Sequence, residues 1–433
     1  MPEAINNKAK NKAKNKQVRR FTFDSRIDYA VILPVLLLIV IGLYALWVAV
    51  SHDYPNQAMT FVLQQGSWVI IGLVIAFLVM HLDAKWLWQL TPAFYFIGLA
   101  LLVLPLFLFD PNLVASTGAK NWVSIGGHTL FQPSEFMKIT YILMLSRWIV
   151  SFQDKLETRE LKDDFRLIGR LFLATLPVAV LSVFQHDFGT FLVFVVILAG
   201  LILVSGVSWK IILPAVLAVV LIIVAVVLLV MNPTGQKFLG EVFSQYQVNR
   251  FVAWLHPFEY TETFSAQQAA ALTSVGIGGL FGKGLGMANV HVPVRESDMI
   301  FTVIGEDFGF IGGVVVIVLY FILIARMIRA TFQSNNPFYT YISTGFIMLL
   351  LFHVFENIGA AIGVVPLTGI PLPFISQGGS ALMADLIGVG LVLSMKYNQL
   401  PDWFNARDQA RRNLEIKKNK RRRAKASQMA SKS

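Results

Sequence analysis

Long apolar segments recur along this chain, and they constrain its fold more than any other feature. A helix needs roughly 20 apolar residues to cross the hydrocarbon core of a bilayer. A membrane β-barrel would instead show segments of about 10 residues with alternating polarity. The sequence therefore predicts an all-α polytopic membrane protein with ten transmembrane helices. The expected spans are residues 27–50, 66–82, 90–109, 133–152, 169–185, 189–206, 210–231, 299–326, 338–364 and 380–396.

Composition agrees with a membrane protein and excludes several kinds of site. Only 14% of the residues are charged and 56% are hydrophobic, whereas a soluble domain carries about 25% charged residues. The chain contains no cysteine, which excludes disulfides, thiolate catalysis and cysteine-ligated zinc. The net charge of +11 does not indicate nucleic-acid binding, because the basic residues gather in segments that flank the apolar runs.

The distribution of Lys and Arg predicts the orientation in the membrane. If the N-terminus lies inside, the inner segments hold 30 of the 36 Lys and Arg residues, as the positive-inside rule requires. Both termini are therefore expected in the cytoplasm, in basic tails at 1–26 and 398–433. Solvated tails and tails that contact anionic lipid are both compatible with this composition. Residues 27–397 then form one membrane domain with long outer loops at 110–132 and 232–298.

A charged stretch from Arg295 to Asp298 precedes the eighth apolar run, and Asp298 is the strongest candidate for chemistry. A carboxylate at the mouth of a membrane helix is costly to bury, so it is a functional-site hypothesis by default. Partial desolvation would raise the pKa of Asp298 and make it a better proton acceptor near neutral pH, whereas Arg295 would oppose that shift. A carboxylate that only caps the helix is the alternative.

Further charged groups are expected on the same side of the membrane. Glu135 and Lys138 follow Pro133 at the start of the fourth run and can pair on one helix face. They form either a structural ion pair or a site in which Lys138 presents a cation to a phosphate while Glu135 positions it. With these cations, the outer side would suit a substrate with a phosphorylated head and a lipid tail. The other outer candidates are Lys120, Asp187, Arg250, Lys283, Arg295 and Glu296.

Polar residues inside the apolar runs need partners. Glu306 and Asp307 are expected to form hydrogen bonds within the bundle. His353, Glu356 and Asn357 share one helix face, which is compatible with a metal or proton site or with a polar cluster between helices.

Glycines mark two further features. Gly305, Gly309 and Gly313 form a ridge of small residues that predicts close helix contact within a continuous helix. The segment Gly282–Gly284 is not a complete P-loop, which excludes a cytosolic nucleotide site, although an outward-facing anion nest is compatible with it.

Several motifs together resemble the SEDS family (RodA, FtsW and SpoVE), and most closely the RodA branch of Gram-positive cocci. They occur in the family's order between residues 27 and 397. They are Gly118–Trp122, Phe131–Lys138, Asp187–Thr190, Gly278–Gly284, Val294–Phe301 and the segment from Asn357 to Ser380.

The resemblance implies a ten-helix SEDS fold and a peptidoglycan glycosyltransferase that polymerises lipid II at the outer face of the cytoplasmic membrane for cell-wall elongation. It places the family's essential aspartate at Asp298, as general base on the acceptor hydroxyl, with undecaprenyl pyrophosphate as the leaving group. The residues expected to bind the pyrophosphate are Lys138, Glu135, Lys120, Lys283 and Arg295, and the expected supporting residues are Asp187, Glu306, Asn357 and Ser376.

The resemblance also predicts partners. These are lipid II, a class B penicillin-binding transpeptidase and other elongation-complex membrane proteins of the MreC and MreD kind. The sequence requires no cofactor, although a divalent cation such as Mg²⁺ or Mn²⁺ could assist at the pyrophosphate. Three other functions stay open, namely a lipid II flippase, a division-specific polymerase of the FtsW type, and a scaffold without a catalytic carboxylate.

Overall fold

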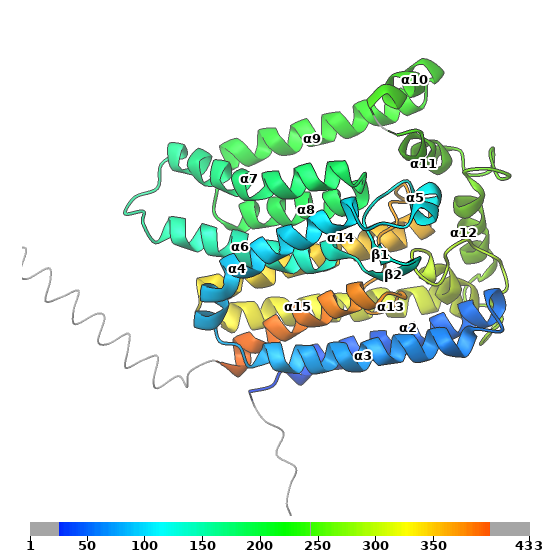
Figure 1. Ribbon diagram of the computed structural model, residues 1–433, viewed down its shortest axis with the longest axis horizontal. Helices are drawn as coiled ribbons and strands as arrows, with labels where there is room; N and C mark the ends of the chain where they lie inside the picture. Colours follow the sequence, from blue (N-terminus) through cyan, green and yellow to red (C-terminus); the bar gives the residue numbers. More distant parts are fainter. Residues whose placement is uncertain (1–25, 243, 399–433) are drawn as a thin grey trace, which may run out of the picture.

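The computed structural model describes residues 26–242 and 244–398, and this part of the chain is a bundle of long helices (Figure 1). The basic tails predicted at 1–26 and 398–433 lie almost entirely outside the described residues. The long helices are α2 (Tyr29–Asp53), α3 (Ala58–Met80), α4 (Ala84–Val103), α6 (Pro133–Gln153), α7 (Leu161–Phe184), α8 (Phe188–Val204), α9 (Trp209–Val230), α13 (Ile300–Gln333), α14 (Pro337–Ala361) and α15 (Gly379–Tyr397).

A helix lies at each of the ten predicted spans, and eight of these helices are long and apolar enough to cross a membrane. The two others are α6, which carries Glu135, Lys138 and Arg147, and α8, which has 17 residues. The polytopic helical class is thereby confirmed. The count of ten spans stays a prediction.

The two long loops contain short elements of their own. The first holds η1 (Leu104–Leu106), α5 (Pro111–Thr117) and an antiparallel hairpin of β1 (Val123–Ile125) and β2 (His128–Phe131). Gly126 and Gly127 form its two-residue turn with φ of 60° and 79°, as the favoured hairpin turns require. The second loop holds α10 (Pro233–Val242), α11 (Gln245–Leu255) and α12 (Ala266–Ile277).

Burial differs strongly between the helices. In α14 and α15, 61% and 67% of the apolar stretch is buried inside the protein, whereas in α9 only 6% is buried. Figure 1 shows α9 along one edge of the bundle, beside α7 and joined to α10. Because α9 is apolar on all sides, its exposed residues are suited to contact with lipid.

An irregular segment, residues 365–378, connects α14 to α15 and enters the protein interior. Its residues Ile370, Leu372 and Ile375 are buried, as irregular backbone at membrane depth must be. Helix α2 approaches it so closely that a Cβ at Gly42 would lie 2.6 Å from the Cα of Ile375. Gln65 of α3 donates a hydrogen bond to the carbonyl of Ser376 at 3.3 Å. These contacts fix the segment that later supports the candidate site.

Helix α13 is not continuous, because Gly309 has φ 64° and ψ −156° within it. The prediction of a continuous helix with a ridge of small residues was therefore wrong at this point. Gly309 packs against the loop that precedes α13, since a Cβ there would lie 2.4 Å from the nitrogen of Gly282. A Cβ at Gly278 would lie 1.9 Å from the carbonyl oxygen of Gly305. The glycines thus allow the loop backbone to rest directly on the α13 backbone.

We expect Gly309→Ala to destabilise the fold by at least about 2 kcal/mol. Its backbone conformation is essentially confined to glycine, and such strain costs about 1–3 kcal/mol before the clash with the loop backbone is added. Thermal or denaturant unfolding of the purified protein in detergent measures the effect. The control is Gly66→Ala in α3, where no atom lies within 4 Å of the new methyl group and a gain of about 0.5–1 kcal/mol is expected. Equal stability of both variants would contradict the role assigned to Gly309.

Candidate functional site

Asp298 lies in a turn immediately before α13, and residues on α14 and on the 365–378 segment hold that turn. Asn357 donates through Nδ2 to the main-chain carbonyls of Asp298, at 2.7 Å, and Ile370, at 2.9 Å. Ser376 donates through Oγ to the carbonyl of Ser297 at 2.6 Å. Asn357 and Ser376, two of the four predicted supporting residues, therefore bind the backbone at the Asp298 turn and make no hydrogen bond to its carboxylate.

The carboxylate of Asp298 faces Gly369 and Arg250. Its Oδ1 accepts a hydrogen bond from Ser297 Oγ at 3.1 Å. Its Oδ2 lies 3.3 Å from the position that a Cβ of Gly369 would occupy, and Arg250 Nη1 lies 3.5 Å from the same point. Burial raises the pKa of Asp298, while the charge of Arg250 and the Ser297 hydrogen bond oppose that shift. The opposing cation is thus Arg250 rather than Arg295, whose predicted effect on this carboxylate was wrong.

Arg295 points away from Asp298 and is buried, with 1% of its surface exposed. Its Nε and Nη2 donate to the two carboxylate oxygens of Asp53 at 2.6 and 3.1 Å. Its other contacts are with the carbonyls of Ala288, Val290 and Ala49. A guanidinium has five N–H donors, so these contacts leave none for a substrate in this conformation. Arg295 therefore joins the end of α2 to the loop that precedes α13.

Lys283 and Glu306 form an ion pair at 2.7 Å. Glu306 is fully buried and also accepts hydrogen bonds from Ser274 Oγ and from the main-chain N–H groups of Asn289 and Val290. The expectation that Glu306 would be satisfied within the protein is confirmed. The charge of Lys283 is used to fasten the loop to α13.

The sequence was compatible with an anion nest near Gly282–Gly284. The structure shows such a group of main-chain N–H donors a few residues later, and the anion that they bind is the side chain of Asp307. Gly286 and Ala288 donate their main-chain N–H groups to Asp307 at 2.8 and 2.6 Å. Tyr44 of α2 donates its hydroxyl to the same carboxylate at 2.6 Å. The carboxylate of Asp307 therefore accepts the hydrogen bonds that an external anion would otherwise accept from these N–H groups.

Lys138 and Glu135 lie 2.7 Å apart in the first turns of α6, and both are buried. Lys138 Nζ also lies 3.4 Å from Nε2 of His353 on α14. These two of the five residues predicted to bind pyrophosphate are thus paired with each other inside the bundle. A substrate phosphate would reach Lys138 only if the helices around this pair moved apart.

Lys120 lies in the loop between α5 and β1, and Asp187 lies at the start of α8. Lys120 Nζ sits over the ring of Phe109, 4.6 Å from its centroid, and its main-chain N–H donates to Gln185 at 2.8 Å. Asp187 caps α8 and accepts a hydrogen bond from Asn121 Nδ2 at 2.7 Å. Asp187 therefore connects α8 to the loop. The side chain of Lys120 is partly exposed.

The polar face of α14 is divided among separate contacts. His353 lies beside Lys138, Glu356 Oε1 accepts from the main-chain N–H of Thr368 at 2.7 Å, and Asn357 holds the Asp298 turn. Within residues 26–242 and 244–398, no three His, Asp or Glu side chains are grouped so as to hold a metal ion. The polar cluster between helices is the arrangement that the structure shows.

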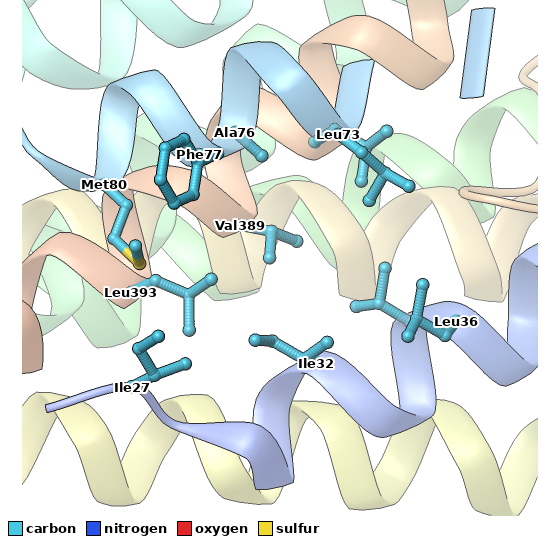
Figure 2. A pocket seen from close by; sticks show the side chains of 11 residues that line it. Ile27, Ile32, Leu36, Leu73, Ala76, Phe77, Met80, Val389 and Leu393 are labelled. Carbon is cyan, nitrogen blue, oxygen red and sulfur yellow. The ribbon is translucent and has the colours of Figure 1, made fainter. Parts of the chain in front are cut away.

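Two apolar grooves open elsewhere on the bundle. One, of about 200 Å³, lies between α2, α3 and α15 at the end of the bundle where the described residues begin and end; Ile32, Phe77 and Leu393 are among the side chains that line it (Figure 2). The other, of about 370 Å³, lies beside the bend of α13 and is lined by Ile41, Phe281 and Phe308, among others. Neither lining contains a group that could act as an acid or a base, so the candidate chemistry stays at Asp298.

Arg250 and Gly369 are the parts of the site that sequence reasoning did not single out. The sequence places Arg250 only among the charged candidates, with no role assigned to it. A capping box of Ser244 and Gln247 starts α11, the helix that carries Arg250. Arg250 donates to the carbonyl of Leu367, which lies 117 positions later in the chain. No local sequence signal predicts a contact over that separation.

Comparison with known proteins decides the family. The family model described as cell cycle protein, which covers FtsW, RodA and SpoVE, matches residues 28–400. This chain belongs to that family. It is 30% identical to stage V sporulation protein E of Bacillus subtilis, across 85% of this chain and 96% of that protein. It is also 30% identical to the peptidoglycan glycosyltransferase MrdB of Escherichia coli, across 84% of this chain and 92% of that protein.

Solved structures agree with this assignment. A chain from a peptidoglycan synthase complex that coordinates polymerization and crosslinking is 26% identical, with a TM-score of 0.67, over 86% of this chain and 99% of its own length. The rod shape determining protein RodA of Thermus thermophilus is 26% identical, with a TM-score of 0.59, over 87% and 98%. The fold is RodA-like, and this member of the family is a multi-pass protein of the cytoplasmic membrane.

Proposed function

We propose that this chain is a peptidoglycan glycosyltransferase that polymerises lipid II into glycan strands for cell-wall elongation. One observation carries the proposal. Asp298 is a partly buried carboxylate with a raised pKa, on a turn fixed by Asn357 and Ser376, with a guanidinium beside it. A family relative of similar length is named a peptidoglycan glycosyltransferase, and this arrangement suits that activity.

In the proposed reaction, the acceptor hydroxyl attacks the anomeric carbon of the donor sugar. The new glycosidic C–O bond forms as the bond to the pyrophosphate breaks, and undecaprenyl pyrophosphate leaves with the bonding electron pair. Asp298 takes the proton of the attacking hydroxyl, which is the role of a general base. Cations near the leaving group would stabilise its charge. Lys120 is the predicted pyrophosphate ligand whose charge no carboxylate of the described residues neutralises by a salt bridge.

We further propose that residues 27–397 form one ten-helix domain with Asp298 on the outer side and both termini in the cytoplasm. The excess of Lys and Arg on the inner segments supports this orientation. A class B transpeptidase is the partner we propose, since the structural relative comes from a complex that couples polymerization to crosslinking.

The test is polymerisation of labelled lipid II by the purified full chain, with and without a class B transpeptidase. Moenomycin is present to silence contaminating transferases that are sensitive to it. Glycan strands of increasing length support the proposal. Transport of lipid II across vesicles without polymer, with a partner known to be active, would favour a flippase and contradict the proposal.

The activity should fall as the pH falls through the raised pKa of Asp298, because protonation removes the base. The acidic limb of the pH profile is therefore expected above the usual Asp value of about 4. Ser297→Ala removes a hydrogen bond that favours the ionised carboxylate, so it should move the limb to higher pH. Initial rates between about pH 4 and pH 9 measure both effects, and a limb that does not move in Ser297→Ala would assign it to another group.

A further inference from the structure

The cations on the outer side differ in whether a carboxylate already neutralises them. Arg295 pairs with Asp53. Lys138 and Lys283 pair with Glu135 and Glu306, each at 2.7 Å. Among the described residues, Arg250 forms no salt bridge, although Asp298 is its close neighbour around Gly369. Its charge therefore remains available to a ligand that reaches Asp298.

Neutral groups hold Arg250 in place. Its Nη1 donates to the carbonyl of Leu367 at 2.8 Å, and its Nη2 donates to the hydroxyl of Tyr246. The guanidinium also lies over the Tyr246 ring, 4.6 Å from its centroid. These contacts use two of the five N–H donors, and the side chain is partly exposed. Arg250 is thus oriented in advance while donors remain for a second partner.

We propose that Arg250 binds the pyrophosphate group of the lipid-linked substrate beside Asp298. The inference rests on the proposed glycosyl transfer and names a ligand-binding residue for it. A planar guanidinium binds phosphate oxygens through two parallel hydrogen bonds, which a lysine ammonium cannot reproduce. As undecaprenyl pyrophosphate leaves, negative charge grows on its phosphate oxygens, and a positioned cation stabilises that charge.

Arg250 also lies close to the proposed base, Asp298, because both side chains approach Gly369. Gly369 has φ 84° and no side chain, so the carboxylate of Asp298 and the guanidinium of Arg250 can both lie close to it. A ligand anion at Arg250 would therefore lie within the same small space as the base.

The experiment measures binding of undecaprenyl pyrophosphate to the purified full chain, with undecaprenol as the uncharged probe. Arg250→Gln should weaken binding of undecaprenyl pyrophosphate by about 10- to 100-fold, since each charge-assisted hydrogen bond is worth about 1.5–3 kcal/mol and 1.4 kcal/mol is tenfold. Binding of undecaprenol should not change. Lys237→Gln on α10 removes an exposed cation from the same loop and should leave both affinities within about twofold of the wild-type values.

Three outcomes would overturn the proposal. The first is wild-type affinity for undecaprenyl pyrophosphate in Arg250→Gln. The second is a shifted pH profile of polymerisation with unchanged affinity, which would make Arg250 a residue that only tunes Asp298. The third, which decides the matter if Arg250→Gln does not fold, is equal affinity of the wild-type protein for undecaprenyl pyrophosphate and undecaprenol.

The binding measurement does not depend on turnover. Loss of binding in Arg250→Gln, together with a wild-type protein that forms no glycan, would contradict the proposed polymerase and keep the pyrophosphate site. If the wild type polymerised lipid II and Arg250→Gln bound undecaprenyl pyrophosphate as tightly as the wild type, the proposed polymerase would stand and the proposed pyrophosphate site would be contradicted.

Discussion

Replacement of Asp298 by Asn is expected to lower lipid II polymerisation by about 100- to 10,000-fold, the usual contribution of a general base. Asn has the same shape but does not accept a proton at neutral pH. The turn should stay intact, because Asn357 and Ser376 bind main-chain carbonyls and not the Asp298 carboxylate. Polymer formed from labelled lipid II by the two purified proteins measures the loss.

The matched control is Glu296→Gln, two residues before the proposed base. Burial also raises the pKa of Glu296, so this variant removes a similar, partly buried carboxylate from the same turn. It should retain most of the activity. If Asp298→Asn polymerised as fast as the wild type, or if Glu296→Gln lost activity equally, Asp298 would not be the base.

Replacement of Arg295 by Met is expected to destabilise the protein by about 3–5 kcal/mol, because it leaves a buried carboxylate without its partner. The Asp53 carboxylate is 9% exposed and accepts from Nε of Arg295 at 2.6 Å. Three main-chain carbonyls, of Ala49, Ala288 and Val290, lose donors in the same variant. Unfolding of the purified protein in detergent measures the change.

His291 offers a control on the same carboxylate. Its ring lies 3.1 Å from Asp53 but its side chain is 74% exposed, so His291→Ala should change stability by less than about 1 kcal/mol. The double variant Arg295→Met with Asp53→Leu should recover part of the loss, since both charges are gone. Wild-type stability of Arg295→Met, combined with weaker binding of undecaprenyl pyrophosphate, would return Arg295 to its predicted role as a ligand.

Local information in the sequence was sufficient for the helices and for the position of Asp298. The free energy of transfer of a segment into the membrane depends on the residues of that segment alone, so ten apolar runs predicted ten helices. Asp298 lies at the boundary between a polar loop and the eighth apolar run, and this boundary can also be recognised from neighbouring residues alone. Asn357 and Ser376 were assigned supporting roles through the family resemblance, and the structure shows both at the Asp298 turn.

Local sequence information could not predict which residue each charged side chain contacts. Arg295 meets Asp53, which is 242 positions earlier in the chain, and Lys138 meets His353, which is 215 positions later. A cation's chemistry depends on whether such a partner neutralises it, and many charged residues were available for each. Sequence reasoning therefore placed Lys138, Lys283, Arg295 and Lys120 in one group of expected pyrophosphate ligands, although the first three are paired with carboxylates.

The amino-acid sequence alone was enough to identify a helical membrane protein of the RodA, FtsW and SpoVE family with a carboxylate at the mouth of its eighth apolar run. Hydrophobicity and short motifs are properties of neighbouring residues, which a sequence displays directly. Three features became visible in the folded chain: α13 bends at Gly309, main-chain N–H groups of the preceding loop bind Asp307, and Arg250 lies close to Asp298. Each of these depends on backbone and charge contacts between segments far apart in the chain.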